Sequence, residues 1–361
     1  MNHSLPDSTP PAAPIRRRRF RFSLRTLLVL VIVLALPLGW IAKERRRSQH
    51  EQEIGEQFRK LGIKEITFGG PYDSWELSMF GRPQGNWRDM ARQVLGTRIL
   101  SLDCAETGFK DLTPLAALTS LQSLVLFNTP VNDLTPLAGL TNLHSLDLNA
   151  TQVSDLSPLA KLIKLQVLDL DSPISDLAPL ENLTELQHIC ISAKVSDLAP
   201  LARLTKLHTL RLDKATISDL TPLTGLIELQ MLILPDCGQV TDLTPLAGLT
   251  RLQHLNLTKS NVRDVAPLAE LTNLRQLNLC NTLVQDITPL AGLANLEQLY
   301  LNHTEVADVT PLFGLSQLRK IYLWNTHVSD EEEEMLRRAL PNCGTIKQSM
   351  KRRPITNPTD S

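Results

Sequence analysis

The sequence of 361 residues lacks the short motifs that mark the common classes of enzyme. It has no glycine-rich phosphate loop, no Gly-x-Ser-x-Gly nucleophile elbow and no His-Glu-x-x-His motif. Its five cysteines are an odd number without Cys-x-x-Cys spacing, so they indicate neither a zinc site nor a disulfide framework. We therefore expect no catalytic residues, no cofactor and no metal.

One motif fills most of the chain. Leu-x-x-Leu-x-Leu, followed by Val or Ile, an Asp and a Pro-Leu step, returns every 21 to 23 residues, with a degenerate extra copy running into Leu102. A fixed period of this length is typical of a solenoid, whose units bury a shared core only by stacking. The ten regular copies begin at Leu121, Leu143, Leu165, Leu186, Leu207, Leu229, Leu252, Leu274, Leu296 and Leu318.

Two leucine spacings alternate within each repeat. In one copy, leucines recur every three residues over 134–146, and the last two, Leu146 and Leu148, are two residues apart. A spacing of three suits a 3₁₀ turn or irregular coil, and a spacing of two suits a strand. Each repeat therefore predicts one short strand and one return segment, with the strands side by side in a parallel sheet about 4.8 Å apart.

Two columns of polar residues keep the same phase as the leucines. An Asp that recurs eleven times, from Asp111 to Asp330, is followed three residues later by Pro in its first ten copies. We interpret these Asp residues as caps of short helical turns and not as a catalytic set. A second, mostly hydroxyl-bearing column after the strands, such as Thr129 and Thr151, is interpreted as internal.

The repeat Asp-Leu-Thr-Pro-Leu-Ala-Gly-Leu-Thr-x-Leu-x-x-Leu-x-Leu resembles the internalin and SDS22-like class of leucine-rich repeats over residues 97–330. The resemblance implies an α/β solenoid, a leucine-rich repeat horseshoe of about 10 to 11 repeats of roughly 22 residues. Its parallel sheet would be concave and its 3₁₀ or coil side convex. The chain departs from that class after the strand, where Thr or Ser stands in place of the usual Asn.

A charge-free segment precedes the repeats. Residues 26–42 lie between a basic arm, residues 1–25, and a second basic cluster that opens at Lys43. Seventeen helical residues at about 1.5 Å each span roughly 25 Å, so we expect one transmembrane signal anchor. A cleaved signal peptide is the alternative, and Trp40 close to the end of the run argues against it. The string Phe22 to Leu30, with Ala339-Leu-Pro-Asn-Cys343, resembles membrane-anchored repeat proteins of planctomycete-type bacteria and also favours the anchor.

The remaining segments complete the predicted organisation. We expect a disordered arm at 1–25, a juxtamembrane helix at 43–60, an N-terminal cap with an irregular insertion at 61–96, a C-terminal capping helix at 331–346 and a disordered tail at 347–361. The basic arm suits anionic lipid better than nucleic acid. Positive charge is nearly balanced across the anchor, and we place the repeats outside the cytoplasm.

Two patches stand out among the residues that alternate with the strand leucines. Asp147, Asp169 and Asp171 form an acidic patch, which either binds a basic peptide or a cation or is simply screened by salt and His144. An aromatic patch near the last two strands either binds a partner or shields the end of the sheet. Its members are Tyr300, Tyr322, Trp324, Arg319 and Lys320.

These observations favour a non-enzymatic, membrane-anchored recognition or scaffolding module that binds a protein or peptide on its concave face. Two alternatives remain. One is a cytoplasmic-facing regulatory subunit of an enzyme, by analogy with SDS22-like proteins, and the other is a structural protein of the cell envelope.

Overall fold

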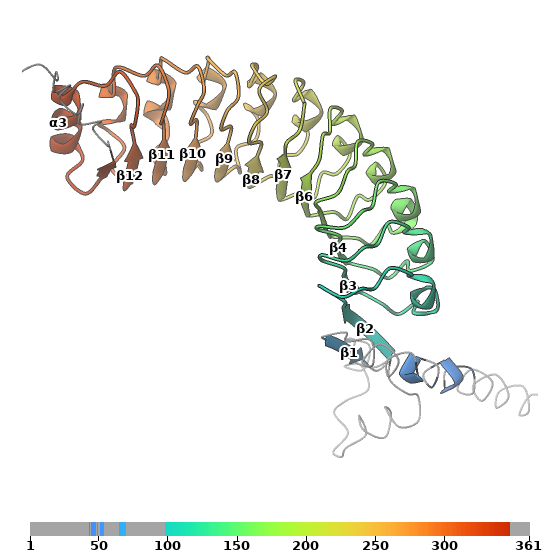
Figure 1. Cartoon of the computed structure of the whole chain (residues 1–361). Coiled ribbons are helices and arrows are strands. Elements are labelled where there is room, and N and C mark those ends of the chain that lie inside the picture. The colour runs from blue at the N-terminus through green and yellow to red at the C-terminus, as the bar shows by residue number, and fades with distance from the viewer. Residues whose placement is uncertain are drawn as a thin grey trace, which may run out of the picture.

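The computed structural model describes residues 43, 45–47, 49, 51–53, 65–69 and 98–346 of the chain. These residues form a curved solenoid, with the strands along the inner side of the curve and short helices along the outer side (Figure 1). The predicted arm at 1–25, anchor at 26–42 and tail at 347–361 lie outside the described residues. Within the described part, no helix combines the length and the apolar character needed to cross a bilayer.

One sheet runs the length of the solenoid. Its thirteen strands follow one another in sequence order; β1 pairs with β2 antiparallel, and β2 to β13 are parallel. The strands are β1 (Glu65–Gly69), β2 (Arg98–Asp103), β3 (Ser123–Val125), β4 (Ser145–Asp147), β5 (Val167–Leu170), β6 (His188–Ser192), β7 (Thr209–Asp213), β8 (Met231–Ile233), β9 (His254–Asn256), β10 (Gln276–Asn278), β11 (Gln298–Tyr300), β12 (Lys320–Tyr322) and β13 (Gly344–Ile346).

A 3₁₀ helix follows each strand from β2 to β11 and lies on the convex side (Figure 1). These helices are η2 (Thr113–Ala117), η3 (Thr135–Leu137), η4 (Ser157–Lys161), η5 (Ala178–Leu180), η6 (Ala199–Leu201), η7 (Thr221–Leu223), η8 (Thr244–Leu246), η9 (Ala266–Leu268), η10 (Thr288–Gly292) and η11 (Thr310–Leu312). The predicted alternation of strand and 3₁₀ turn is confirmed.

The leucines at both spacings point inward. Leu137, Leu140 and Leu143 from the return segment and Leu146 and Leu148 from the strand are all completely buried. A spacing of three matches the three residues per turn of a 3₁₀ helix, so that segment also turns one side to the core. Burial of each leucine contributes about 1.5 to 3 kcal/mol, and repetition along the chain builds one continuous core.

The Asp column caps the 3₁₀ helices, as the sequence predicts. Asp133 Oδ1 accepts the backbone N–H of Thr135, the first helical residue, at 2.8 Å. The helix cap itself is the intervening Leu134, so the carboxylate acts from one position further out. The same bond recurs, at 2.8 to 2.9 Å, from Asp111, Asp155, Asp176, Asp197, Asp219, Asp242, Asp264, Asp286 and Asp308.

The hydroxyl column is internal, which is also confirmed. The buried Thr129 Oγ1 donates to the carbonyl of Leu126 at 2.7 Å. Thr151, Thr282 and Thr304 are likewise buried and repeat the bond three residues back, also at 2.7 Å. These hydroxyls satisfy strand-end carbonyls that are removed from water.

The C-terminal end is closed by α3 (Asp330–Ala339) and β13, which corrects the predicted helix at 331–346. The helix begins one residue earlier and ends before Pro341, because proline cannot continue it. Ser329 and Glu332 form a capping box at its start. Residues 344–346, which the prediction included in the helix, form β13 instead and pair with β12.

At the opposite end, the described part of the predicted 43–60 segment is helical. Glu51 in this helix is buried, and its Oε2 accepts the backbone N–H of Ile99 at 2.8 Å. Arg47 pairs with Glu51 at 3.2 Å and also contacts Thr119 and Ser120. This helix therefore packs against the first repeats, a contact that the repeat pattern gives no means to predict. Of the predicted cap at 61–96, only β1 is described.

Candidate functional site

One row of side chains runs along the concave face at equivalent strand positions. Register pairing aligns Asp103, Val125, Asp147, Asp169, Cys190, Arg211, Ile233, Asn256, Asn278, Tyr300 and Tyr322. Because alternate residues of a strand face the same way, this row lies opposite the buried leucines. It is the surface on which the variable residues of all repeats meet.

Asp147 has a structural task in this row. Its Oδ1 accepts the backbone N–H of Asn149 at 2.8 Å, where β4 ends. Asp103, Asn256 and Asn278 make the same bond two residues on, at 2.9 to 3.0 Å. Burial raises the pKa of Asp147, and the nearby charges of Asp169 and Asp103 raise it further, whereas the bond from Asn149 lowers it. An amide performs the same bonding elsewhere, so the capping does not require a charge.

The turn after the strand is regular in most repeats. The second residue after the last leucine of the Leu-x-x-Leu-x-Leu motif, or after its equivalent Cys104, has a positive φ, between 52° and 63°. The residues in this left-handed conformation are Glu106, Asn128, Ala150, Lys214, Asp236, Lys259, Asn281, His303 and Asn325.

The two 21-residue repeats, which begin at Leu165 and Leu186, depart from this pattern. These repeats lack the left-handed position: the buried Ser172 and Ala193, which correspond to Thr129 and Thr151, come one residue earlier after the strand, and neither has a positive φ. The neighbouring strands are longer here: β5 has four residues and β6 and β7 have five each, compared with three in β3 and β4.

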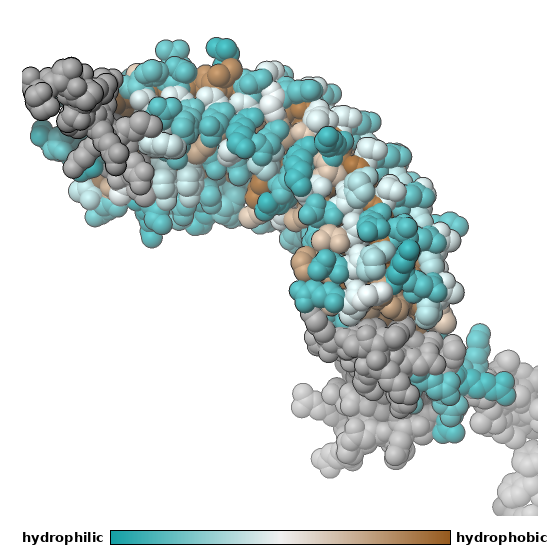
Figure 2. All heavy atoms as spheres, viewed as in Figure 1, coloured by the Kyte–Doolittle hydropathy of each residue, from teal (hydrophilic) through white to brown (hydrophobic). Residues whose placement is uncertain are grey.

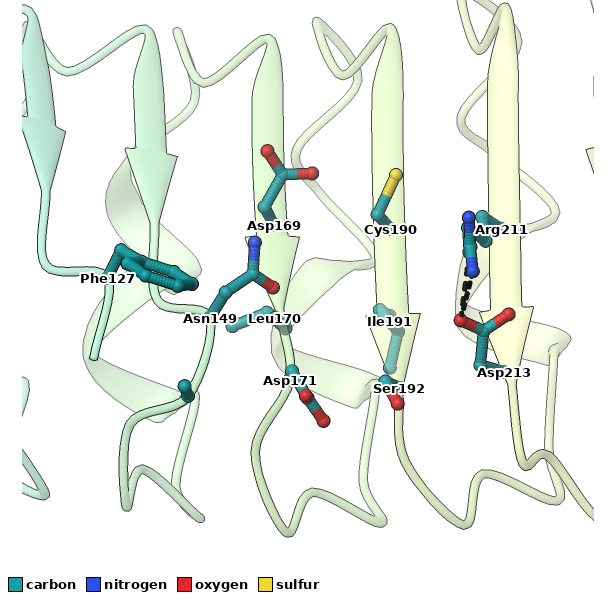
Figure 3. Close-up of a pocket in the computed structure, with 11 residues that line it drawn as sticks. Phe127, Asn149, Asp169, Leu170, Asp171, Cys190, Ile191, Ser192, Arg211 and Asp213 are labelled. Atoms are coloured by element: carbon teal, nitrogen blue, oxygen red, sulfur yellow. Dashed lines mark hydrogen bonds and ion pairs between the residues drawn. The ribbon is translucent and has the colours of Figure 1, made fainter.

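A recess of about 400 Å³ lies on these two repeats and the strand on either side (Figure 3). Asp169 and Asp171 come from β5 and the residue after it, and the Cys190 thiol lies beside Asp169 on β6. Arg211 and Asp213 pair with each other on β7 at 2.7 Å. Burial, followed by the charge of Asp169 and its hydrogen bond, raises the pKa of Cys190 to about 11.

A second recess of about 440 Å³ adjoins the first at the turns. It shares Asp171 and Ser192 with the first recess, and it is also lined by Thr151, Ser172, Pro173, Ile174, Ser175, Ala193, Lys194 and Lys214. The predicted acidic patch is thus divided: Asp169 and Asp171 line the first recess, while Asp147 is a neighbour of Asp169 that caps its own strand.

The aromatic patch is assembled by β11 and β12. The rings of Tyr300 and Tyr322 stack with centroids 4.4 Å apart and planes 6° apart, and Trp324 meets His303 edge to face at 4.4 Å. The Tyr300 hydroxyl donates to Gln298 Oε1 at 2.8 Å. Burial, and next the neighbouring Tyr322, raise the pKa of Tyr300.

All three aromatic residues are half-buried, so part of each ring faces solvent. Lys320 is exposed and lies two residues before Tyr322, on the same side of the strand. Arg319 is also exposed but precedes the strand. The structure therefore brings the aromatic rings and Lys320 together, and it leaves Arg319 at their border.

Comparisons with known proteins agree with this geometry. A family model described as leucine-rich repeats (2 copies) matches residues 141–182 and 272–314. The chain is 31% identical to an internalin from Listeria monocytogenes of known crystal structure, over 66% of this chain and 70% of that one, with a TM-score of 0.61. The chain belongs to the internalin-like leucine-rich repeat proteins.

More distant structures share the fold alone. A leucine-rich repeat protein from Leptospira interrogans is 19% identical, over 69% of this chain and 72% of that one, with a TM-score of 0.61. The Arabidopsis receptor kinase HAESA, in complex with a peptide hormone and a co-receptor, is 20% identical over 63% and 42%, with a TM-score of 0.56. A search of curated proteins gives no match.

The surface of this internalin-like protein is mostly hydrophilic on the face seen in Figure 2. Phe127 is 40% exposed and borders the first recess. His188 and His208 approach to 6.2 Å between ring centroids, but no group of three or more metal-binding side chains occurs in the described part of the chain. The five cysteines are all free.

Proposed function

We propose that this protein is a non-enzymatic recognition module that binds a protein or peptide segment on its concave face. The observation that carries the proposal is the stacked pair Tyr300 and Tyr322, which lies half-exposed beside Trp324 at one end of the concave row. Partly exposed aromatic side chains on a rigid strand lose little conformational freedom on binding, and they dominate the binding energy of many interfaces.

The fold supports the same assignment. Leucine-rich repeat proteins are protein-binding modules, and the plant receptor ectodomain that shares this fold is described in complex with a peptide hormone. The sheet offers an extended surface of thirteen strands, held rigid by a continuous leucine core. A rigid surface of this kind suits a partner that lies across several strands.

We further propose that residues 26–42 anchor the chain in a membrane and that the repeats face away from the cytoplasm. The charge-free run between two basic clusters supports this arrangement. Added to intact cells, protease should then degrade the repeats. Survival of the repeats until the cells are lysed would instead place them in the cytoplasm and favour a regulatory subunit.

The binding face is tested by the double substitution Tyr322→Ala and Trp324→Ala in the full-length, solubilised protein. Loss of two interface aromatics should weaken capture of a cross-linked partner by about tenfold or more. The matched control is Ile163→Ala with Ile227→Ala, two exposed apolar side chains that lie away from the concave strands. Equal capture by the patch variant and the control would exclude this patch as the binding site.

A further inference from the structure

The recess on β5 to β7 lies where two consecutive repeats are each one residue shorter than most others. Their turns close by short bonds, from Ile174 N to Ser172 O at 2.7 Å and from Val195 N to Ala193 O at 2.8 Å. The turns on either side keep their left-handed residues, Ala150 and Lys214. Ala150 lines the first recess and Lys214 lines the second. The recess thus coincides with a local departure from an otherwise regular scaffold.

The charges in this recess do not balance. Three carboxylates, those of Asp169, Asp171 and Asp213, line it, against the one guanidinium of Arg211. Arg211 is already paired with Asp213, and the other oxygen of that carboxylate, Oδ1, is buried with no hydrogen-bond partner in the described structure. Asp147 adds another negative charge at the next register position to Asp169. Like charges on adjacent strands cost stability unless a cation lies between them.

The walls of the recess suit an organic cation. Phe127 is 40% exposed at one edge and supplies an apolar, aromatic surface for an aliphatic stem or a guanidinium plane. The volume of about 400 Å³ is at the lower end of ligand pockets, sufficient for one or two side chains. Toward the turns, Lys194 and Lys214 rim the adjoining recess and disfavour a second positive charge there.

We propose that this recess binds a lysine or arginine side chain of an extended peptide segment, held between Asp169 and Asp171 and against Phe127. The inference rests on the proposed function, because it names the chemistry of the partner that the concave face binds. Lys194 and Lys214 in the adjoining recess orient the segment. The peptide residues that lie toward the turns, next to the basic one, should be neutral or acidic.

The test is selection of a random seven-residue peptide library on the full-length protein. Peptides enriched on the native sequence should carry a Lys or Arg, and their affinity, measured by fluorescence polarisation, should fall about tenfold in Asp169→Asn/Asp171→Asn. Glu181→Gln/Glu185→Gln makes the same change in charge near the convex turn of the same repeat and should leave affinity unchanged. Binding of the native protein should also weaken as salt rises.

The alternatives give different results. Enriched peptides without a basic residue, or equal affinity for both charge variants, would overturn the inference. If the enriched peptides lack a basic residue but bind Tyr322→Ala/Trp324→Ala more weakly than the native protein, the proposed function would still stand. Failure to enrich any peptide, together with unaltered partner capture by the aromatic variant, would count against both. Binding of Ca²⁺ alone that is lost in Asp169→Asn/Asp171→Asn would replace the peptide by a metal ion.

Discussion

Asp147 and Asp169 stand at the same register position on adjacent strands but have different surroundings. Asp147 accepts a backbone amide where its strand ends, as Asn256 and Asn278 do. Asp169 lies on a strand that continues for one more residue, and its carboxylate lies beside the Cys190 thiol instead. The same residue type is therefore structural in one repeat and is available for binding in the next.

At this scale, Asp147→Asn should keep the cap while removing repulsion from Asp169 and Asp103. We expect the free energy of unfolding to stay constant or rise by about 0.2 kcal/mol, since Asp147 is half-exposed and its charge is screened. Asp147→Ala should lower it by about 0.5 to 1.5 kcal/mol through the lost hydrogen bond. Urea unfolding measures both, with Asn256→Ala as the uncharged control. Equal losses in the Asn and Ala variants would show that the charge itself stabilises the fold.

Among the elements, α3 is the one that closes the leucine core at its C-terminal end. Leu336 and Leu340 are buried and extend the core beyond the last repeat, and the partly buried Phe313 packs against the same core. Acidic residues in the first turn and Arg337 and Arg338 in the last both suit the helix dipole. Glu333 is buried and pairs with Arg337 at 2.7 Å.

Ser329→Ala removes one half of the capping box and should destabilise this end by about 1 kcal/mol. Hydrogen exchange should then speed up first in α3 and β13, because each repeat contacts only its neighbours. Ser316→Ala, an exposed serine of the preceding turn, is the control. If exchange accelerated equally in every repeat, the solenoid would unfold as one cooperative unit and α3 would not be a separate cap.

Much of the solenoid follows from the sequence, because its leucines, Asp caps and prolines repeat at fixed distances and each position has one physical explanation. The recess was not predictable in the same way. The shorter period at Leu165 and Leu186 is visible in the sequence, but its effect on the turns at Ser172 and Ala193 depends on backbone closure. Because the sequence pattern does not show how the turns close, it places Asp147 in one acidic patch with Asp169 and Asp171. The stacking of Tyr300 on Tyr322 follows from register, while their exposure had to be observed.

Across the whole molecule, the Asp column makes stability depend on pH. Hydrogen bonds from a neighbouring Thr or Ser hydroxyl, and then from its backbone amide, lower the pKa of Asp111, Asp133, Asp155, Asp219, Asp242 and Asp286. A carboxyl whose pKa is lower in the folded state stabilises the fold above its unfolded pKa of about 3.9 and loses this effect as the pH falls through the folded value. The raised pKa of Asp147 acts in the opposite sense.

We therefore expect the urea midpoint to fall between about pH 5 and about pH 2, because six lowered carboxyls outnumber the one raised carboxyl of the concave acidic patch. Asp219→Asn/Asp242→Asn keeps an acceptor at two caps and removes two titrating groups, so its midpoint should change less over the same range. A midpoint that stayed flat or rose on acidification in the native protein would contradict this account.

The half-buried thiols have a practical consequence. Cys190 lies in the recess, and Cys280 lies close to Asn302 and Tyr300, at the aromatic patch. Each proposed contact region thus contains one native cysteine whose alkylation can report on coverage by a ligand. Burial raises the pKa of both thiols, so alkylation is slow at neutral pH and is best followed over time or at alkaline pH. A partner that covers only one region should slow alkylation of that cysteine relative to the other, so mass spectrometry of the unaltered protein reports where along the concave face a ligand binds.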